Sequence, residues 1–402
     1  MVDKRAARRA RGFASATILI DLAGLGIILP VMPDLIFELS GAPIGEATAI
    51  GGWLLFSYAA MQFLFAPLLG HLSDRWGRRP VLLAALGGLA VNYGLMAVAP
   101  SLGWLFVGRL LSGLLGATYP VAAASVADVT PPEKRVGQFG ILHAMVGLGL
   151  IVGPLIGGIA AAYGVRAPLW TAASLALATL VAGYFLFPET LAADARRLPS
   201  QEARRWSPFP KWNPLIPVPL LIVFFLVEVA FQALPSVWAF YAIDALDWSA
   251  VRIGYSMAFY GMAIALAQIA LPGPMERLLG TKGAGMVALA CVTTAYLGLS
   301  LSSNEALTWP LILVMALGTT IFPILQATLS RSIDGDAQGT MQGVMSSVTA
   351  IAVIVSPLLM TQIFKAFVGA EAGAPPSWPG APFLAAAVLS GLAALLYLRF
   401  FR

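Results

Sequence analysis

The ten residues Gly70-His71-Leu72-Ser73-Asp74-Arg75-Trp76-Gly77-Arg78-Arg79 decide the fold class of this chain. They carry three arginines and one aspartate, and they separate two apolar runs at 51–69 and 80–98. Each run has about the 20 residues that an α-helix needs to cross the hydrocarbon core of a bilayer. Charged residues between two such runs predict a tight turn at a membrane face. The chain is therefore expected to be an integral membrane protein.

The composition agrees with a membrane protein. Of the 402 residues, 59% are hydrophobic and 11% are charged, whereas soluble domains have about 25% charged residues. One cysteine (Cys291) and two histidines (His71 and His143) exclude a disulfide framework and a metal site rich in cysteine or histidine. The net charge of +5 is explained by its placement between spans, so we expect no nucleic-acid partner. We expect His71 to be an exposed loop residue, and His143 and Cys291 to be ordinary span residues.

Apolar windows of about 20 residues predict twelve membrane-spanning helices in an all-α fold. A charged segment at 189–214 divides them into an N-terminal six-helix half (1–188) and a C-terminal six-helix half (215–402). The basic N-terminus and the apolar run after it are expected to form an uncleaved first span rather than a signal peptide. The spans are predicted near 13–33, 48–69, 80–99, 103–126, 138–162, 167–187, 216–243, 250–273, 283–302, 307–329, 340–367 and 381–400.

Lysine and arginine are distributed unevenly between the two faces of the membrane. With the N-terminus in the cytoplasm, all but four of the 24 Lys and Arg residues fall in segments expected to be cytoplasmic, as the positive-inside rule requires. Both termini are therefore expected to be cytoplasmic, in a bacterial inner membrane. The four exceptions are Arg109, Arg166, Arg252 and Lys365.

The two halves repeat at an offset of 203 residues. Such a repeat predicts two similar helical bundles, as many secondary transporters have. The second copy of the charged turn, at 273–280, keeps its glycines but has Arg277 where Asp74 would map, so we expect it to be degraded. The matching positions are Gly70 and Gly273, Gly77 and Gly280, Gly140 and Gly343, and Gly153-Pro154-Leu155 and Ser356-Pro357-Leu358.

Several motifs along the chain resemble those of the major facilitator superfamily. The turn at 70–79 resembles its signature loop, Arg109 to Ala117 resembles its fourth-span motif, and Gly149 to Gly158 resembles its antiporter motif. Within that superfamily the chain is similar to the tetracycline-efflux subgroup of drug:proton antiporters. The subgroup pattern is carried by Asp21 to Pro33, Arg79 to Leu83, Ala127 to Thr130 and Pro235 to Trp238.

The chain departs from the tetracycline pumps at positions that bear on the substrate. Those pumps carry an acid in the third span, where this chain has Asn92, and a glycine in the fourth, where it has Tyr119. A further acid expected in span nine is missing from Ala290 to Thr293. The loss of charge and the added ring change what would fit, so we expect a substrate other than tetracycline itself.

Two acidic residues are predicted near the middle of the membrane. At 1.5 Å per residue, Asp21 lies roughly 13 Å into span one and Glu228 roughly 18 Å into span seven, in a core about 30 Å thick. Because low-dielectric surroundings disfavour a charged carboxylate, either group could take up and release a proton near neutral pH. The subgroup resemblance offers no acid at the position of Glu228. The alternative is that either is a hydrogen-bonded contact between helices.

Arg109 is predicted roughly 10 Å inside span four. An arginine keeps its charge, so it needs a carboxylate, a carbonyl or an anionic substrate. The superfamily resemblance implies that it tunes the protonation of a membrane acid. The alternative is a static tie between helices.

The charged turn is expected to gate the cytoplasmic side. Asp74 would meet the N-terminus of span eleven near Gly339, where the helix dipole is positive. Arg75 or Arg79 would pair with Asp128 at the end of span four. The alternative is a loop of positive charge that only sets the topology. The gating residues are Gly70, Asp74, Arg75, Gly77, Arg78, Arg79 and Asp128.

Two further sets of span residues are candidate functional groups. The glycines of span five form a small-residue face that permits close helix packing, and a proline kinks this span; the set is Gly149, Gly153, Pro154, Gly157 and Gly158. Aromatic and amide side chains that could line a central cavity would suit an amphipathic aromatic compound, and the alternative for each is ordinary packing. This second set is Tyr58, Gln62, Asn92, Tyr93, Tyr119, Phe231, Gln232, Trp238, Tyr260 and Gln268.

We therefore expect a monomeric, proton-coupled antiporter that exports a hydrophobic or amphipathic drug-like compound by alternating access. It would use the proton gradient and no cofactor or metal. The alternatives are a proton-coupled uptake symporter for a small organic solute and a non-transporting sensor on the same fold. An enzyme is disfavoured because no Ser-His-Asp set is apparent, and an ATP-driven pump because no Gly-Lys-Ser/Thr phosphate loop occurs.

Overall fold

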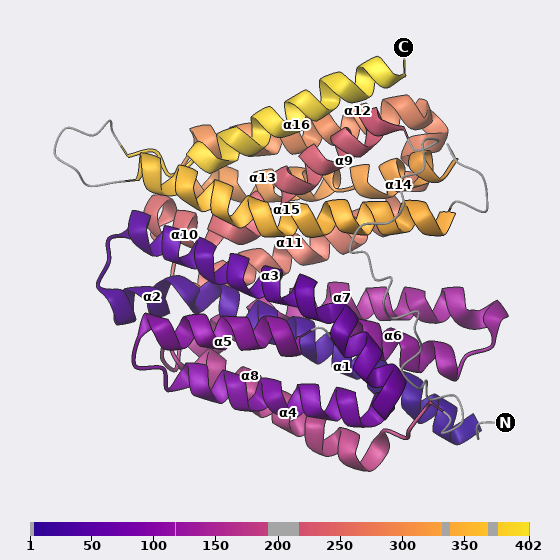
Figure 1. The fold of residues 1–402 in the computed structure, drawn as a ribbon. Coiled ribbons are helices and arrows are strands. Elements are labelled where there is room, and N and C mark those ends of the chain that lie inside the picture. The colour runs from indigo at the N-terminus through magenta and orange to yellow at the C-terminus, as the bar shows by residue number, and fades with distance from the viewer. Residues whose placement is uncertain (1–3, 117, 192–216, 332–337, 369–376, 402) are drawn as a thin grey trace. The chain divides into compact units, whose positions relative to one another are not determined.

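The computed structural model describes residues 4–116, 118–191, 217–331, 338–368 and 377–401. These residues form sixteen α-helices and one 3₁₀ helix, with no strand among them (Figure 1). In chain order the elements are α1 (Lys4–Ile28), η1 (Leu29–Val31), α2 (Met32–Ser40), α3 (Ile44–Trp76), α4 (Arg78–Ala97), α5 (Leu102–Leu115), α6 (Thr118–Asp128), α7 (Pro132–Ala161), α8 (Ala167–Leu186), α9 (Val218–Phe231), α10 (Ala233–Leu246), α11 (Ala250–Ala270), α12 (Pro272–Leu301), α13 (Glu305–Gly318), α14 (Ile321–Arg331), α15 (Gln338–Phe367) and α16 (Ala381–Phe400).

The predicted all-α membrane fold is confirmed. Twelve helical stretches of the described residues are long and apolar enough to cross a membrane. Most of the predicted charged segment 189–214 lies outside the described residues, because only 189–191 of it are described.

Four of the spans are broken, whereas the apolar windows predicted continuous helices. The first span is interrupted by η1, the fourth at Gly116, the seventh at Gln232 and the tenth at Thr319. A broken helix in a membrane must satisfy its freed backbone groups internally. At Gly116 the amide still donates to the Ser112 carbonyl at 2.7 Å, and the Thr319 hydroxyl donates to the Ala316 carbonyl at 2.7 Å. The breaks therefore recur at every third span.

Contacts along the chain divide it into two compact units. Unit 1 comprises Met1–Gly41, Ser57–Arg205 and Ala250–Ala258, and unit 2 comprises the rest. Helices α3 and α11 therefore contribute residues to both units.

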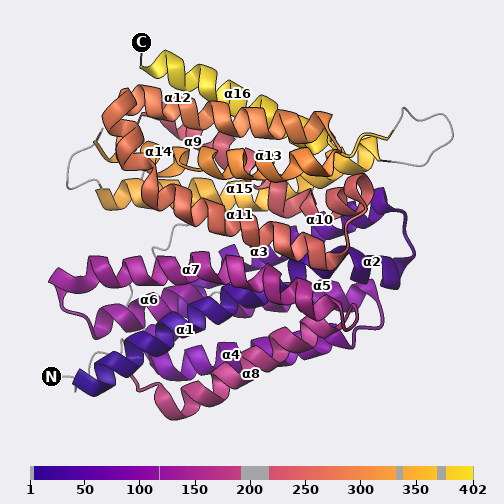
Figure 2. The same ribbon diagram turned by 180° about the vertical axis from the view of Figure 1, so that it is seen from behind.

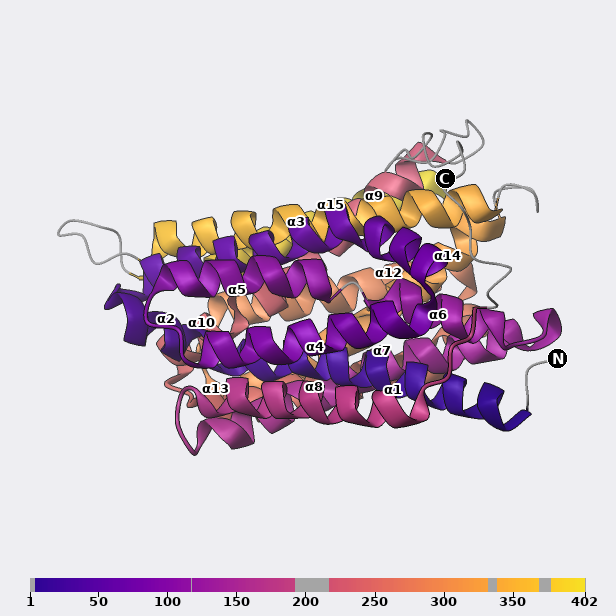
Figure 3. The ribbon, with the colours of Figure 1, turned by 60° about the horizontal axis from the view of Figure 1, so that its bottom comes forward.

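In unit 1, α1 packs along α7 and α8 (Figure 2), and α8 also lies beside α4 (Figure 3). Its core contains two clusters of buried side chains, one around Phe13, Leu82 and Phe187 and one around Ile18, Ala122 and Leu142. In unit 2, α12 packs against α16, and α16 packs against α9.

The charged stretch 70–79 is more helical than the predicted turn. Helix α3 continues through it to Trp76, and α4 begins at Arg78. Only Gly77 leaves the helical conformation, with φ +103°, and its amide donates to the Ser73 carbonyl at 3.1 Å. A positive φ at this value suits glycine because a Cβ would be strained there. The predicted ten-residue turn is thus a single-residue hinge between two helices.

Candidate functional site

Asp21 lies in α1 beside the break of the fourth span. Its Oδ2 atom accepts a hydrogen bond from the Thr118 hydroxyl at 2.6 Å. Thr118 is the first residue of α6, directly after the break, and is 1% exposed. The carboxylate itself is half-buried. An acid at membrane depth marks an ion or substrate path, because a charge there is costly to keep.

Gly116 shows that Tyr58 and Asp21 border the same small space. A methyl group built on Gly116 would lie 3.6 Å from Tyr58 Oη and 3.8 Å from Asp21 Oδ1. Gln62 Nε2 donates to Tyr58 Oη at 3.1 Å and to the Gly116 carbonyl at 3.4 Å. The helix break thus brings a carboxylate, a phenol and an amide together.

Arg109 adds a buried positive charge to this cluster. The residue is 1% exposed, and the centre of its guanidinium lies 5.4 Å from the centroid of the Tyr58 ring. Its Nε atom has no hydrogen-bond partner in the part of the chain that the structure describes. The face of an aromatic ring attracts a cation, so the Tyr58 ring partly compensates Arg109. We refer to Asp21, Tyr58, Gln62, Arg109 and Thr118 as the unit 1 polar cluster.

Asn92 and Tyr93 occupy packing positions beside the cluster. Asn92 Nδ2 donates to Ser112 Oγ at 2.7 Å and to the Gly108 carbonyl at 3.0 Å, and it thereby ties α4 to α5. Tyr93 is 5% exposed and its hydroxyl lies against Gly24 of α1. Asn92 is therefore engaged between helices in this structure.

Tyr119 and His143 form a second polar pair in unit 1. Tyr119 Oη and His143 Nδ1 are 2.9 Å apart, and their ring centroids are 5.8 Å apart. Tyr119 follows Thr118 directly, and the His143 side chain is exposed. This pair was not predictable from the sequence, because the two residues are on different helices and a single histidine in a span has no local signature.

Unit 2 also holds a buried acid. Glu228 in α9 is 8% exposed, and its Oε1 atom accepts a hydrogen bond from the Thr349 hydroxyl at 2.9 Å. The ring of Phe231 lies one turn further along α9, 6.5 Å from the Tyr260 ring and 5.2 Å from the Phe322 ring. Asp21 in unit 1 and Glu228 in unit 2 thus each accept a hydrogen bond from a threonine hydroxyl.

The other three predicted pocket residues of unit 2 differ in exposure. Gln232 is half-buried at the break between α9 and α10, and Gln268 is exposed, with its Nε2 atom 3.5 Å from the Thr319 hydroxyl. Trp238 is 1% exposed and stacks on Tyr241 with ring centroids 5.7 Å apart. Trp238 thus belongs to the aromatic core of unit 2.

Arg78 is the centre of the gating stretch in unit 1. Its Nη1 atom lies 2.6 Å from Asp74 Oδ1, and its Nε atom lies 3.2 Å from Asp128 Oδ2. The same Nη1 atom donates to Ser73 Oγ at 2.7 Å. Arg78 is 7% exposed, while the side chains of Asp74 and Asp128 are 38% and 22% exposed, so this is a partly buried ion network that joins α3, α4 and α6.

The prediction that Arg75 or Arg79 pairs with Asp128 is wrong. The partner is Arg78, because the hinge at Gly77 turns the first residue of α4 toward the end of α6. Arg75 is exposed, and Arg79 Nη2 donates to the Tyr184 carbonyl at 2.6 Å. The predicted contact of Asp74 with the start of span eleven would join the two units and stays a prediction.

Glu189 is a participant that sequence reasoning missed, because it was assigned to the linker. Its Oε1 atom accepts hydrogen bonds from the amides of Arg78 at 2.9 Å, Thr190 at 3.0 Å and Leu191 at 3.0 Å. A carboxylate at the first amides of α4 also complements the positive end of the helix dipole. A Cβ on Gly77 would overlap Glu189 Oε2. The lack of a side chain at Gly77 therefore leaves room for the Glu189 carboxylate at the start of α4.

The corresponding turn of unit 2 is rebuilt rather than degraded. Gly280 has φ +67°, Glu276 Oε1 lies 2.7 Å from Arg331 Nη1, and the Thr281 hydroxyl donates to the same Oε1 atom at 2.7 Å. At the offset of 203 residues, Arg331 stands where unit 1 has Asp128. The ion pair is retained with its charges exchanged.

The glycines of the predicted antiporter motif lie where α7 touches α1. A Cβ on Gly149 would lie 2.8 Å from the Leu19 carbonyl, and one on Gly153 would lie 2.6 Å from the Ala23 carbonyl. Gly157 meets the Ile27 carbonyl still more closely. The two backbones are therefore in direct contact over two turns. Pro154 lies against Gly26 of α1, and Gly158 packs on Gly254 of α11.

Comparison with known proteins identifies the relatives of the chain. The model of the Major Facilitator Superfamily matches residues 14–357. The class C tetracycline resistance protein of Escherichia coli is 37% identical over 352 residues, which cover 87% of this chain and 88% of that protein. The class G protein of Vibrio anguillarum is 36% identical over 379 residues, which cover 92% of each.

A solved structure supports the fold. The bacterial homologue of the human lysosomal transporter Spinster matches with a TM-score of 0.80 at 14% identity, covering 99% of this chain and 97% of that one. These matches confirm the resemblance inferred from the motifs.

Proposed function

The chain belongs to the major facilitator superfamily, and from that premise we propose that it is a proton-coupled antiporter that exports a hydrophobic or amphipathic drug-like compound. It is a membrane transporter and not an enzyme. The observation that carries the proposal is the unit 1 polar cluster, in which the Asp21 carboxylate and the buried Arg109 flank the Tyr58 side chain.

Asp21 is the proposed proton carrier. As a carboxylate it accepts the Thr118 hydrogen bond and supplies a negative charge beside the Tyr58 side chain, whose ring lies against Arg109. When Asp21 binds a proton, the cluster loses this negative charge and keeps the positive charge of Arg109. A substrate and a proton that alternate at this cluster would couple export to proton entry, with the halves rocking around the site. The proton gradient is the energy source, and no cofactor takes part.

Glu228 is the proposed second titratable group. It is more deeply buried than Asp21 and has an equivalent threonine partner. Its neighbour Phe231 contacts Tyr260, so a change in its charge occurs beside aromatic rings. We propose that it contributes to coupling or to selectivity for charged substrates.

The substrate is proposed to be an amphipathic aromatic compound. The relatives are named tetracycline resistance proteins, and the candidate contact residues here are aromatic rings and amides, which suit a flat, partly polar molecule. The proposed contact residues are Tyr58, Gln62, Tyr119, Phe231, Gln232, Tyr260 and Gln268. Asn92, Tyr93 and Trp238 are proposed to shape the site through packing.

The Arg78 network is proposed to act as a gate element. Asp74, Arg78 and Asp128 join three helices of unit 1, and Gly70, Arg75, Gly77 and Arg79 complete the stretch. The antiporter motif is proposed to keep α1 and α7 together during the cycle. The chain is proposed to be monomeric and to have both termini in the cytoplasm. An uptake symporter and a non-transporting sensor are not favoured by relatives that confer drug resistance.

Export by the whole protein tests this function. The chain is expressed in a bacterial host that lacks its own efflux pumps and is screened against dyes and antibiotics that include tetracycline. Exported compounds are then assayed in inverted membrane vesicles with and without a proton gradient. We expect gradient-dependent export that Asp21→Asn abolishes and Glu228→Gln reduces.

Asp34→Asn is the matched control, because it removes another half-buried aspartate charge of unit 1 outside the polar cluster. It should leave export unchanged. Export that persists in both Asp21→Asn and Glu228→Gln would overturn the coupling assignment. Gradient-dependent accumulation of a compound inside the cells, instead of its export, would favour an uptake symporter.

A further inference from the structure

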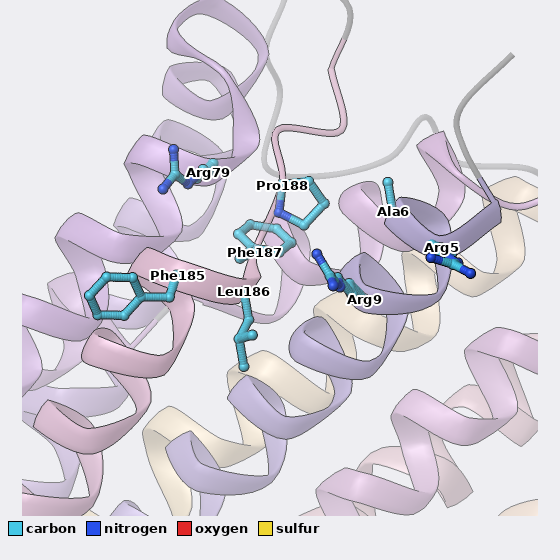
Figure 4. A pocket seen from close by; sticks show the side chains of 8 residues that line it. All are labelled: Arg5, Ala6, Arg9, Arg79, Phe185, Leu186, Phe187 and Pro188. Carbon is cyan, nitrogen blue, oxygen red and sulfur yellow. The ribbon is translucent and has the colours of Figure 1, made fainter.

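Cavities of opposite charge lie in the two units. In unit 1, the cavity where α1 begins and α8 ends has Arg5, Arg9 and Arg79 in its wall (Figure 4). In unit 2, a cavity of about 360 Å³ lies where α10 and α12 end, beside the segment that precedes α16. Asp244 is the one charged side chain among the described residues that line it. The unit 2 cavity is therefore a candidate site for a positively charged ligand.

The hydrogen-bond donors of the two aromatic wall residues are already engaged. The Tyr241 hydroxyl donates to the Leu299 carbonyl at 3.1 Å and to the Ser302 carbonyl at 3.0 Å. The Trp378 indole N–H donates to the Ser300 carbonyl at 2.8 Å. A phenol and an indole each have one such proton, so neither side chain has a further proton for a ligand. These bonds instead hold the end of α12 against α10 and the segment before α16.

The groups that remain are acceptors. Asp244 is exposed, in the last turn of α10, and it forms no hydrogen bond or ion pair with the residues that the structure describes. The last turns of α10 and α12, with Ala245 and Leu301, also border the cavity. The C-terminal end of a helix dipole is negative and attracts cations. A carboxylate beside two such ends gives the cavity a negative potential.

Ser300 supplies a second acceptor, independent of the charge of Asp244. The residue is 4% exposed, and its Oγ atom is buried without a hydrogen-bond partner among the described residues. A buried hydroxyl that is left unpaired is costly. Because Ser300 belongs to the cavity wall, a ligand that donates a hydrogen bond could satisfy its oxygen.

We propose that this cavity binds a protonated organic amine, with the ammonium group at Asp244 and Ser300 and the apolar part along Leu301 and Trp378. A volume of about 360 Å³ is in the range of pockets for small organic molecules and exceeds what a bare metal ion needs. Leu301 is 70% exposed, and an indole ring attracts a cation. A bound amine joins α10, α12 and the segment before α16, so it stabilises unit 2.

Amine binding by the purified full-length protein tests the proposal. Benzylamine, which is charged at neutral pH, is titrated calorimetrically, with benzyl alcohol, sodium and calcium as comparisons. We expect benzylamine to bind and to raise the unfolding temperature. Asp244→Asn should weaken binding about fivefold, which is the most that an exposed ion pair contributes. Ser300→Ala should weaken binding without lowering the unfolding temperature of the ligand-free protein, because it removes a hydroxyl that has no partner among the described residues.

Asp247→Asn is the matched control, because it removes an exposed acid three residues further along the chain, outside the cavity wall. Asp247 has φ +51°, a conformation that asparagine tolerates. The variant should bind benzylamine within about twofold of the parent protein. Equal losses in Asp244→Asn and Asp247→Asn would overturn the proposal in favour of unspecific charge attraction.

Two results of the comparison ligands would also overturn the proposal. One is equal binding of benzyl alcohol, which would make the cavity an apolar pocket, and the other is binding of sodium or calcium without benzylamine. The titration uses no proton gradient, so its outcome is separate from that of the export assay.

Discussion

The charged turns of the two units have the same backbone feature and opposite chemistry. Each turn has a glycine with positive φ, Gly77 in unit 1 and Gly280 in unit 2. In unit 1 the buried Arg78 lies between two acids whose side chains are 38% and 22% exposed. In unit 2 the side chains of the Glu276–Arg331 pair are 32% and 58% exposed. The two turns therefore share a backbone conformation, but we expect their ion pairs to contribute differently to stability.

Arg78→Gln should have the largest effect on this comparison. It leaves Asp74 and Asp128 without their cation, and because their side chains are 38% and 22% exposed, water offsets part of the about 3–5 kcal/mol that breaking a buried ion pair costs. We expect a marked fall in unfolding temperature and a loss of export. Arg75→Gln is the control, because it removes an exposed charge from the same stretch. If the two variants were equally impaired, net charge rather than the network would be responsible.

Gly77→Ala should have the next largest effect. A Cβ in the left-handed region costs about 1–2 kcal/mol, and at Gly77 it would also displace the Glu189 cap. Gly280→Ala should lower the stability only through backbone strain, since among the described residues no atom beyond the chain neighbours lies within 4 Å of its Cβ position. The measurement is thermal unfolding of both variants. Equal losses would show that Glu189 adds nothing to the hinge.

Thr118→Val should have a moderate effect that compares the two acids. It removes the hydrogen bond to Asp21, and a hydrogen bond to a charged group contributes about 1.5–3 kcal/mol. We expect gradient-dependent export to fall about tenfold or more, while Thr349→Val, beside Glu228, should reduce it less. The opposite order would make Glu228 the principal coupling acid.

Glu276→Gln should have the smallest effect. An exposed ion pair contributes about 0–1 kcal/mol, so the unfolding temperature should barely change, and any change should vanish at high salt. The measurement is thermal unfolding at low and high ionic strength. A fall in unfolding temperature as large as that of Arg78→Gln would show that the ion pairs of the two turns contribute equally to stability.

The membrane spans were predictable from the sequence, because they depend on local hydrophobicity. Twelve apolar windows predicted the spans, and single charges within them marked Asp21, Arg109 and Glu228. The partners of these groups were not predictable in this way. Thr118 lies 97 residues from Asp21, and Glu189 lies 111 residues from Arg78, so each pair depends on tertiary packing and not on spacing.

The helix breaks and the unit 2 turn show the same limit. A proline follows Gln232 and Thr319 within four residues, at Pro235 and Pro323, and disfavours a continuous helix there, but an apolar window does not register this signal. At the unit 2 turn, comparison by identity found Arg277 at the place of Asp74 and missed the acid beside it, Glu276. A pair with exchanged charges preserves an interaction while erasing the motif.

The contact between α1 and α7 has a mechanical consequence. Gly149, Gly153 and Gly157 place the backbone of α7 directly on that of α1, so no flexible layer of side chains separates the two helices. We therefore expect the two helices to move together as one rigid body, so that a displacement of α1 near Asp21 would also displace α7.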